Sequence, residues 1–251
     1  MKDTYLFSYD VLFEGKEPSN GAVDLLKNLA RAGRSFLILT DRSCYSRQRL
    51  AEKLYEAGFP LFSEEVFYTS AMAAVDAIVK NYPERNYASY IGNDAMKDLL
   101  EAGGFQLGSG KPDWVFIGEN RQASYQDYSD ALQAVTSGAT IVSVSDRAVL
   151  NDRGKQEPGP ASITMMLEYA SRKESLVSGW SSPVMVKKAV RYIGAKKENT
   201  VFISADLDKE ISSAQNAGVD TVFVLNGKQI DLNESKVKPT FVVDTLRGLF
   251  K

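Results

Sequence analysis

Histidine is absent from the 251-residue sequence, and cysteine occurs once, as Cys44. Without histidine the chain lacks the usual general base, the serine–histidine pair of many hydrolases and the commonest zinc ligand. A single cysteine excludes an intrachain disulfide and a cysteine cluster for zinc or iron–sulfur. With no histidine to activate its thiol, we expect Cys44 to be a small buried side chain. Catalysis by this chain would therefore depend on carboxylates, hydroxyls, lysine or arginine.

The sequence also lacks an excess of positive charge and any long apolar run. It has 30 Lys and Arg against 32 Asp and Glu, and the basic residues do not cluster. We therefore expect neither nucleic-acid binding nor a polybasic membrane anchor. No apolar run approaches the roughly 20 residues that a membrane-spanning helix needs, and the N-terminus lacks the apolar core of a signal peptide. These absences predict a cytoplasmic protein that binds no membrane.

Apolar strands alternate with amphipathic helices along the chain. A continuous apolar run at 35–39 is typical of a buried parallel strand, and Ser70 is a candidate N-cap for the helix over 70–81. Strand–helix order with short loops predicts an α/β fold, a Rossmann-like doubly wound parallel sheet. From residue 82 the same order continues in what reads as an insertion. We predict a core domain of residues 1–81 and 179–251 and an inserted α/β cap of residues 82–178.

Landmarks at strand ends and helix starts occur in a recognisable order. They are Ser8-Tyr9-Asp10-Val11, Thr40-Asp41-Arg42-Ser43, Thr69-Ser70-Ala71, Pro158-Gly159-Pro160, Gly179-Trp180-Ser181-Ser182-Pro183 and the run from Ser204 to Ile211. This order resembles the haloacid dehalogenase (HAD) superfamily, in its NagD-like and 4-nitrophenyl-phosphatase-like branch. The resemblance spans nearly the whole chain and implies the HAD core with a cap.

The resemblance also implies a phosphatase site, in which three positions differ from the expected residue. Asp10 would be the acid/base, and Thr40 would bind the phosphoryl group. Ser8 stands where the nucleophilic aspartate is expected, Trp180 where a lysine is expected, and Ala205 where the principal Mg²⁺ ligand is expected. A preorganised charge at such a site contributes about 10²–10³ in rate. We therefore predict a silent or very weak phosphatase homologue that binds a ligand or partner at the cleft between core and cap.

Other acids near the fourth motif leave a second hypothesis open. Asp10, Asp206 and Asp208 would rebuild a Mg²⁺ site in a working phosphatase of small phosphorylated metabolites. Alternatively Asp206, Asp208 and Glu210 cap and solvate the start of the helix that follows. The loss at Ala205 argues against Mg²⁺, and we expect no nucleotide cofactor.

Two further positions carry alternatives for ligand binding. Asp41, Arg42 and Ser43 are candidate ligand-binding residues, with Arg42 either binding an anion or forming a surface salt bridge. Trp180 either fills the emptied phosphate pocket or stacks against a ligand.

The resemblance implies a homodimer formed through the cap, so a third hypothesis is a structural subunit. We expect a small phosphorylated metabolite or a protein as the partner.

Overall fold

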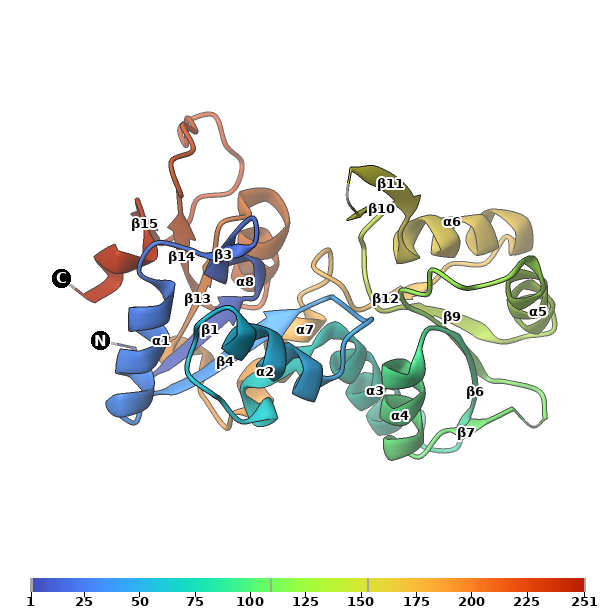
Figure 1. The fold of residues 1–251 in the computed structure, drawn as a ribbon. Helices are drawn as coiled ribbons and strands as arrows, with labels where there is room; N and C mark the ends of the chain where they lie inside the picture. Colours follow the sequence, from blue (N-terminus) through green and yellow to red (C-terminus); the bar gives the residue numbers. More distant parts are fainter. Residues whose placement is uncertain (1, 109, 153, 251) are drawn as a thin grey trace. The chain divides into compact units, whose positions relative to one another are not determined.

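A computed structural model describes residues 2–108, 110–152 and 154–250 of the chain (Figure 1). Contacts divide the chain into two compact units. Unit 1 is Met1–Thr40, Arg47–Tyr68 and Val186–Lys251, and unit 2 is Asp41–Ser46 and Thr69–Met185. Unit 2 therefore includes the helix over 70–81 and the segment after residue 40, both of which the sequence assigned to the core. The boundaries of core and cap at residues 82 and 178 remain a prediction.

The sheet of unit 1 has the order β15-β14-β13-β1-β4-β5. Its strands are β1 (Thr4–Ser8), β4 (Ser35–Thr40), β5 (Phe67–Thr69), β13 (Thr200–Ser204), β14 (Asp220–Val224) and β15 (Phe241–Val243). β1 pairs in parallel with β13 on one side and with β4 on the other. Leu6 and Phe7 in β1 are buried, as expected of a strand covered on both faces. The predicted parallel α/β fold is confirmed.

Helices and short turns complete unit 1. They are α1 (Ala22–Arg31), α2 (Arg47–Glu56), α7 (Val184–Tyr192) and α8 (Ser212–Asn216), the hairpin β2 (Phe13–Glu14) and β3 (Glu17–Pro18), and the short turns η1 (Asp10–Leu12), η2 (Glu64–Val66), η3 (Lys197–Asn199), η4 (Leu207–Ile211) and η5 (Leu246–Phe250). The helix expected to start near Asp206, Asp208 and Glu210 is the π-helical turn η4 followed by the short helix α8.

Unit 2 has a parallel sheet of its own, in the order β12-β9-β8-β6-β7. Its elements are α3 (Ser70–Asn81), β6 (Tyr87–Ile91), α4 (Asp94–Ala102), β7 (Gln106–Leu107), β8 (Trp114–Ile117), α5 (Tyr125–Thr136), β9 (Thr140–Ser143), the hairpin β10 (Val149–Asp152) and β11 (Lys155–Pro158), α6 (Pro160–Ser171) and β12 (Leu176–Val177). One face packs against α3 and α4, and the other packs against α5 and α6. Each face therefore has a separate apolar core.

The start of α3 corrects the predicted N-cap. The Thr69 hydroxyl accepts a hydrogen bond from the Met72 backbone N–H at 3.2 Å, so Thr69 is the N-cap. Ser70 is buried instead, and its hydroxyl donates to the carbonyl of Val144.

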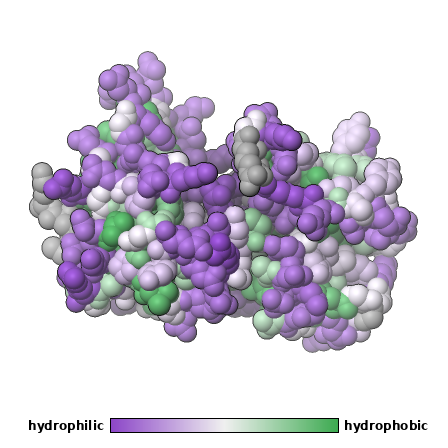
Figure 2. All heavy atoms as spheres, viewed as in Figure 1, coloured by the Kyte–Doolittle hydropathy of each residue, from purple (hydrophilic) through white to green (hydrophobic). Residues whose placement is uncertain are grey.

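In the face shown in Figure 2, hydrophilic residues dominate and hydrophobic ones are scattered. No helix in the described part of the chain is long and apolar enough to cross a bilayer.

Candidate functional site

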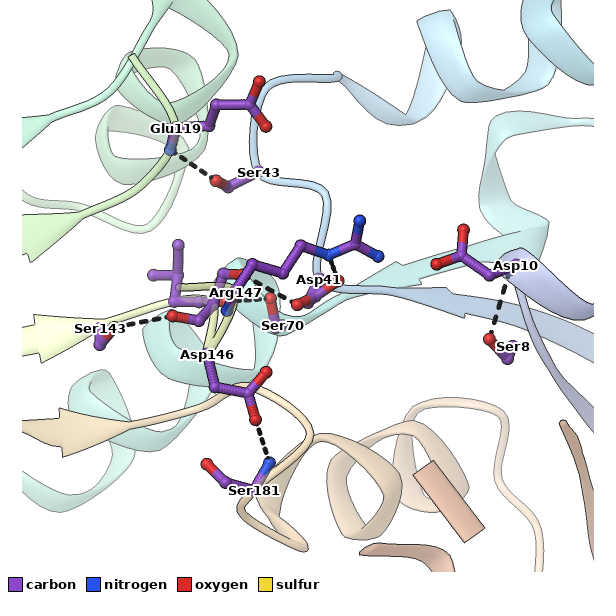
Figure 3. Close-up of polar contacts among 12 residues, drawn as sticks. Ser8, Asp10, Asp41, Ser43, Ser70, Glu119, Ser143, Asp146, Arg147 and Ser181 are labelled. Carbon is purple, nitrogen blue, oxygen red and sulfur yellow. Dashed lines mark hydrogen bonds and ion pairs between the residues drawn. The ribbon is translucent and has the colours of Figure 1, made fainter. Parts of the chain in front are cut away.

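Ser8 and Asp10 follow one another at the carboxyl end of β1, the central strand of unit 1. In parallel α/β sheets this end is where ligands bind. Ser8 is only 1% exposed, whereas Asp10 is exposed and begins η1. The Asp10 backbone N–H donates to Oγ of Ser8 at 3.3 Å (Figure 3). The predicted acid/base position therefore faces solvent, and the predicted nucleophile position is buried.

Glu210 contacts the same strand end and is a site residue whose role the sequence did not predict. It is 5% exposed, so the expectation that it solvates a helix start is wrong. The Ser204 hydroxyl donates to Oε2 of Glu210 at 2.5 Å, and the Ser8 side chain also hydrogen-bonds to the carboxyl group. Burial raises the pKa of Glu210 to about 8, against the opposing effect of these hydrogen bonds. Near neutral pH Glu210 is therefore a neutral carboxylic acid.

One signal in the sequence would have located this residue. Leu207, Glu210 and Ile211 are all buried, with the spacing i, i+3 and i+4 of one helical face. A glutamate on an apolar face is a candidate buried acid.

Asp206 has a structural role at the same strand end. It is exposed, and its Oδ1 accepts a hydrogen bond from the Lys209 backbone N–H at 2.9 Å. The alternative in which Asp206 caps the following turn is confirmed. Asp208, the second residue of η4, is also exposed.

The described residues do not form a Mg²⁺ site. Mg²⁺ prefers an octahedron of oxygens that includes ionised carboxylates. Ser8 and Ala205 stand where the resemblance expects carboxylates, Glu210 is buried and hydrogen-bonded to Ser204, and Asp206 accepts from a backbone N–H. Within the described chain no group of three or more Asp, Glu, His or Cys side chains is arranged to hold a metal ion. The donor set therefore disagrees with the metal that the resemblance implies.

A cavity of about 360 Å³ opens at this strand end. Among its lining residues are Asp10, Asp206, Glu210, Asn226 and Lys228. Ser8 is not among the described residues that line it. A neighbouring cavity of about 630 Å³ shares Ala205, Asp206 and Lys228 with the first. The cavity presents Asp10 and Lys228 to a ligand, and the nucleophile position lies beneath its surface.

The segment after β4 contains a buried ion pair within unit 2. Thr40 ends β4 and is 2% exposed. Asp41 is 1% exposed, and its carboxylate accepts from Arg147 Nε and from the Ser145 hydroxyl, both at 2.8 Å (Figure 3). Burial raises the pKa of Asp41, and the Arg147 charge opposes that shift. Asp41 therefore belongs to a structural network of hydrogen bonds. The sequence had suggested Asp41 as a ligand-binding residue instead.

The remaining predicted residues also lie in unit 2. The Ser43 hydroxyl accepts from the Glu119 backbone N–H at 2.9 Å, which makes Ser43 a structural residue as well. Arg42 is half-buried. Trp180 is 4% exposed, and the next residue, Ser181, donates its N–H to Asp146 at 2.5 Å. Cys44 is partly buried, and burial raises the pKa of its thiol to about 12, so it is not a nucleophile.

Comparison with known proteins agrees with this fold. The family described as haloacid dehalogenase-like hydrolase matches residues 8–106, and a second, HAD-hydrolase-like family matches residues 177–249. The chain belongs to the haloacid dehalogenase-like superfamily. Within this HAD superfamily its similarities lie in the NagD-like branch: NagD from E. coli K-12 superposes with a TM-score of 0.90, at 25% identity, over 99% of this chain and 98% of that one.

Relatives by sequence are named phosphatases. The chain is 26% identical to the 5′-nucleotidase YutF of Bacillus subtilis, over 96% of this chain and 95% of the relative. It is 28% identical to an acid sugar phosphatase of Staphylococcus aureus, over 94% and 92%. HAD phosphatases generally use Mg²⁺. The chain therefore has the fold of a HAD phosphatase.

Proposed function

We propose that this chain is a HAD-fold protein with silent or very weak phosphatase activity, which binds a small ligand or a protein partner. The observation that carries the proposal is the hydrogen bonding of Ser8. Its hydroxyl is buried, accepts from the Asp10 N–H and is hydrogen-bonded to Glu210. A nucleophile must instead reach the phosphorus atom from the surface of a cavity.

The charges support the same proposal. A HAD phosphatase attacks phosphorus with an ionised carboxylate and holds the phosphoryl oxygens with a metal and a lysine. Here the expected nucleophile is a hydroxyl, the lysine position is Trp180, and the metal ligand position is Ala205. Loss of a preorganised charge at such a site costs about 10²–10³ in rate, and loss of the covalent route costs more. These losses do not add because the residues act as a unit.

A second candidate is a working phosphatase, and the names of the relatives favour it. The chain matches these relatives, which are named as phosphatases, over nearly their whole length. Asp10 is exposed and lines the cavity. In this candidate Asp10 acts as acid and base, and a small phosphorylated metabolite is the substrate. Asp206 would have to leave its backbone partner to bind a metal.

Phosphate release distinguishes the two candidates. The purified protein is incubated with 4-nitrophenyl phosphate and with a panel of sugar and nucleoside monophosphates, first with Mg²⁺ and then with EDTA. Asp10→Asn is the matched control because it keeps the shape of the side chain and removes its charge. The proposal predicts no release above that control, whereas Mg²⁺-dependent release that is lost in Asp10→Asn would overturn it.

The partner and the oligomeric state are part of the proposal. We propose a small phosphorylated metabolite or a protein as the partner and a dimer formed through residues 82–178. Light scattering of the purified protein across a concentration series tests the dimer: a monomer at every concentration would contradict it.

A further inference from the structure

Lys228 provides a positive charge at the carboxyl end of the unit 1 sheet. Its Nζ donates to the backbone carbonyl of Ala205 at 2.9 Å. Ala205 is the residue at which the HAD resemblance expects the metal-binding carboxylate. The Lys228 ammonium is therefore hydrogen-bonded to Ala205, the position at which the resemblance expects a carboxylate.

A tight turn positions Lys228. The backbone N–H of Lys228 donates to the carbonyl of Leu225 at 2.9 Å, and the two residues between them, Asn226 and Gly227, have φ of +48° and +75°. Positive φ at both central positions is the signature of a type I′ turn, for which Asn-Gly is the preferred pair. The Asn226 N–H is also bonded to the Asp244 carbonyl at 2.9 Å. The backbone of Lys228 is therefore anchored beside β15.

The cavity that Lys228 lines carries several acidic side chains. Asp10, Glu14, Asp206 and Glu210 are the aspartates and glutamates among the described lining residues. Lys228 is the one lysine or arginine among the described lining residues. A fixed ammonium near several carboxylates offsets part of their mutual repulsion. A divalent ion entering the same cavity would be repelled by that ammonium.

We propose that Lys228 is the resident cation of this cavity and takes the place of the divalent metal, so that the site is compensated without Mg²⁺. The inference rests on the proposed function, because a site of this kind has no metal-dependent step. Lys228 is exposed, so its hydrogen bond contributes little to folding and its replacement should leave the fold intact.

Metal affinity tests the proposal, with Mn²⁺ as the probe, followed by electron paramagnetic resonance and calorimetry. The variants are Lys228→Ala, Lys228→Gln and the double variant Lys228→Ala with Asp10→Asn. Lys236→Ala is the matched control, because Lys236 lines the neighbouring cavity but is not among the described residues of this one. Lys228→Gln keeps a donor for the Ala205 carbonyl and removes only the charge.

We expect no saturable Mn²⁺ binding by the wild type or by Lys236→Ala. Both single variants at Lys228 should gain saturable Mn²⁺ binding, since removal of a like charge favours the cation, and Asp10→Asn should abolish the gain. Saturable wild-type binding that depends on Asp10, or Lys228 variants no tighter than Lys236→Ala, would overturn the inference. Mg²⁺-independent phosphate release would overturn the proposed function and leave this inference standing.

Discussion

The Ser204 hydroxyl donates to Oε2 of Glu210 at 2.5 Å, and both side chains are buried beneath the carboxyl end of the central sheet. Ser204 ends β13 and directly precedes Ala205, so its hydroxyl holds the buried acid at the end of that strand. The Ser8 side chain joins the same acid from β1. Two strands that carry charged catalytic groups in a HAD phosphatase are here linked by hydrogen bonds among uncharged groups.

Glu210→Gln should remove a decrease of stability with rising pH. The folded-state pKa of Glu210 is about 8, against an ordinary value of 4.5, so the folded protein binds the extra proton between these values. Stability is therefore highest below the lower value and falls as pH rises through the interval. Gln cannot ionise, so at pH 9 we expect this variant to exceed the wild type by a few kcal/mol.

Urea unfolding from pH 5 to pH 9 measures this difference. Glu234→Gln, at an exposed glutamate, is the control and should follow the wild type. Parallel stability curves for Glu210→Gln and the wild type would show that Glu210 is not a buried neutral acid.

Arg147→Met should destabilise the protein more than the double variant Asp41→Asn with Arg147→Met. Arg147 Nε is 2.8 Å from the buried carboxylate of Asp41, so its removal leaves a buried charge without its ion partner. Such a loss costs about 3–5 kcal/mol, and removing both charges costs less. Because the pKa of Asp41 is already raised by burial, the loss should grow as pH rises.

Chemical unfolding of the four proteins in this double-mutant cycle gives the coupling energy. Arg49→Met is the comparison, because Arg49 pairs with Glu52 and Glu56 on the surface and should cost less than about 1 kcal/mol. Equal destabilisation by Arg147→Met and Arg49→Met would contradict a buried pair at Asp41.

Gly21→Ala should destabilise the protein more than Gly33→Ala. Gly21 has a φ of +86°, and a Cβ there would lie 2.5 Å from the backbone nitrogen of Arg247. Gly33 has a φ of +61° with nothing within 4 Å of an added Cβ. The left-handed backbone costs about 1–2 kcal/mol at both sites, and the clash adds roughly 1–3 kcal/mol at Gly21 alone. Thermal melting checks the order, and equal melting temperatures would contradict the close approach of Arg247.

The main strands were predictable because burial on both faces leaves continuous apolar runs. The strand predicted over 35–39 matches β4 to within one residue. Strands of two residues, such as β2 and β3, have no period to detect. The helix expected after β13 is present, but it begins as the π-helical turn η4, which a 3.6-residue period does not distinguish from an α-helix.

Contacts at the site between residues far apart in the sequence could not be predicted from local patterns. Asn226-Gly227 signals a turn, but the hydrogen bond from Lys228 to Ala205 joins residues 23 apart in the sequence. The pairing of Asp41 with Arg147 spans 106 residues. A charged residue is expected at the surface, so its burial is visible only after the fold brings its partners together.

Phosphate release by the wild type, compared with a variant that restores the expected catalytic groups, tests the central claim most directly. Ser8→Asp, Trp180→Lys, Ala205→Asp and Lys228→Ala are combined in one chain, and 4-nitrophenyl phosphate is supplied with Mg²⁺. The account predicts Mg²⁺-dependent release from the restored chain and none from the wild type above its Asp10→Asn variant. Mg²⁺-dependent release by the wild type, lost in Asp10→Asn, would contradict it.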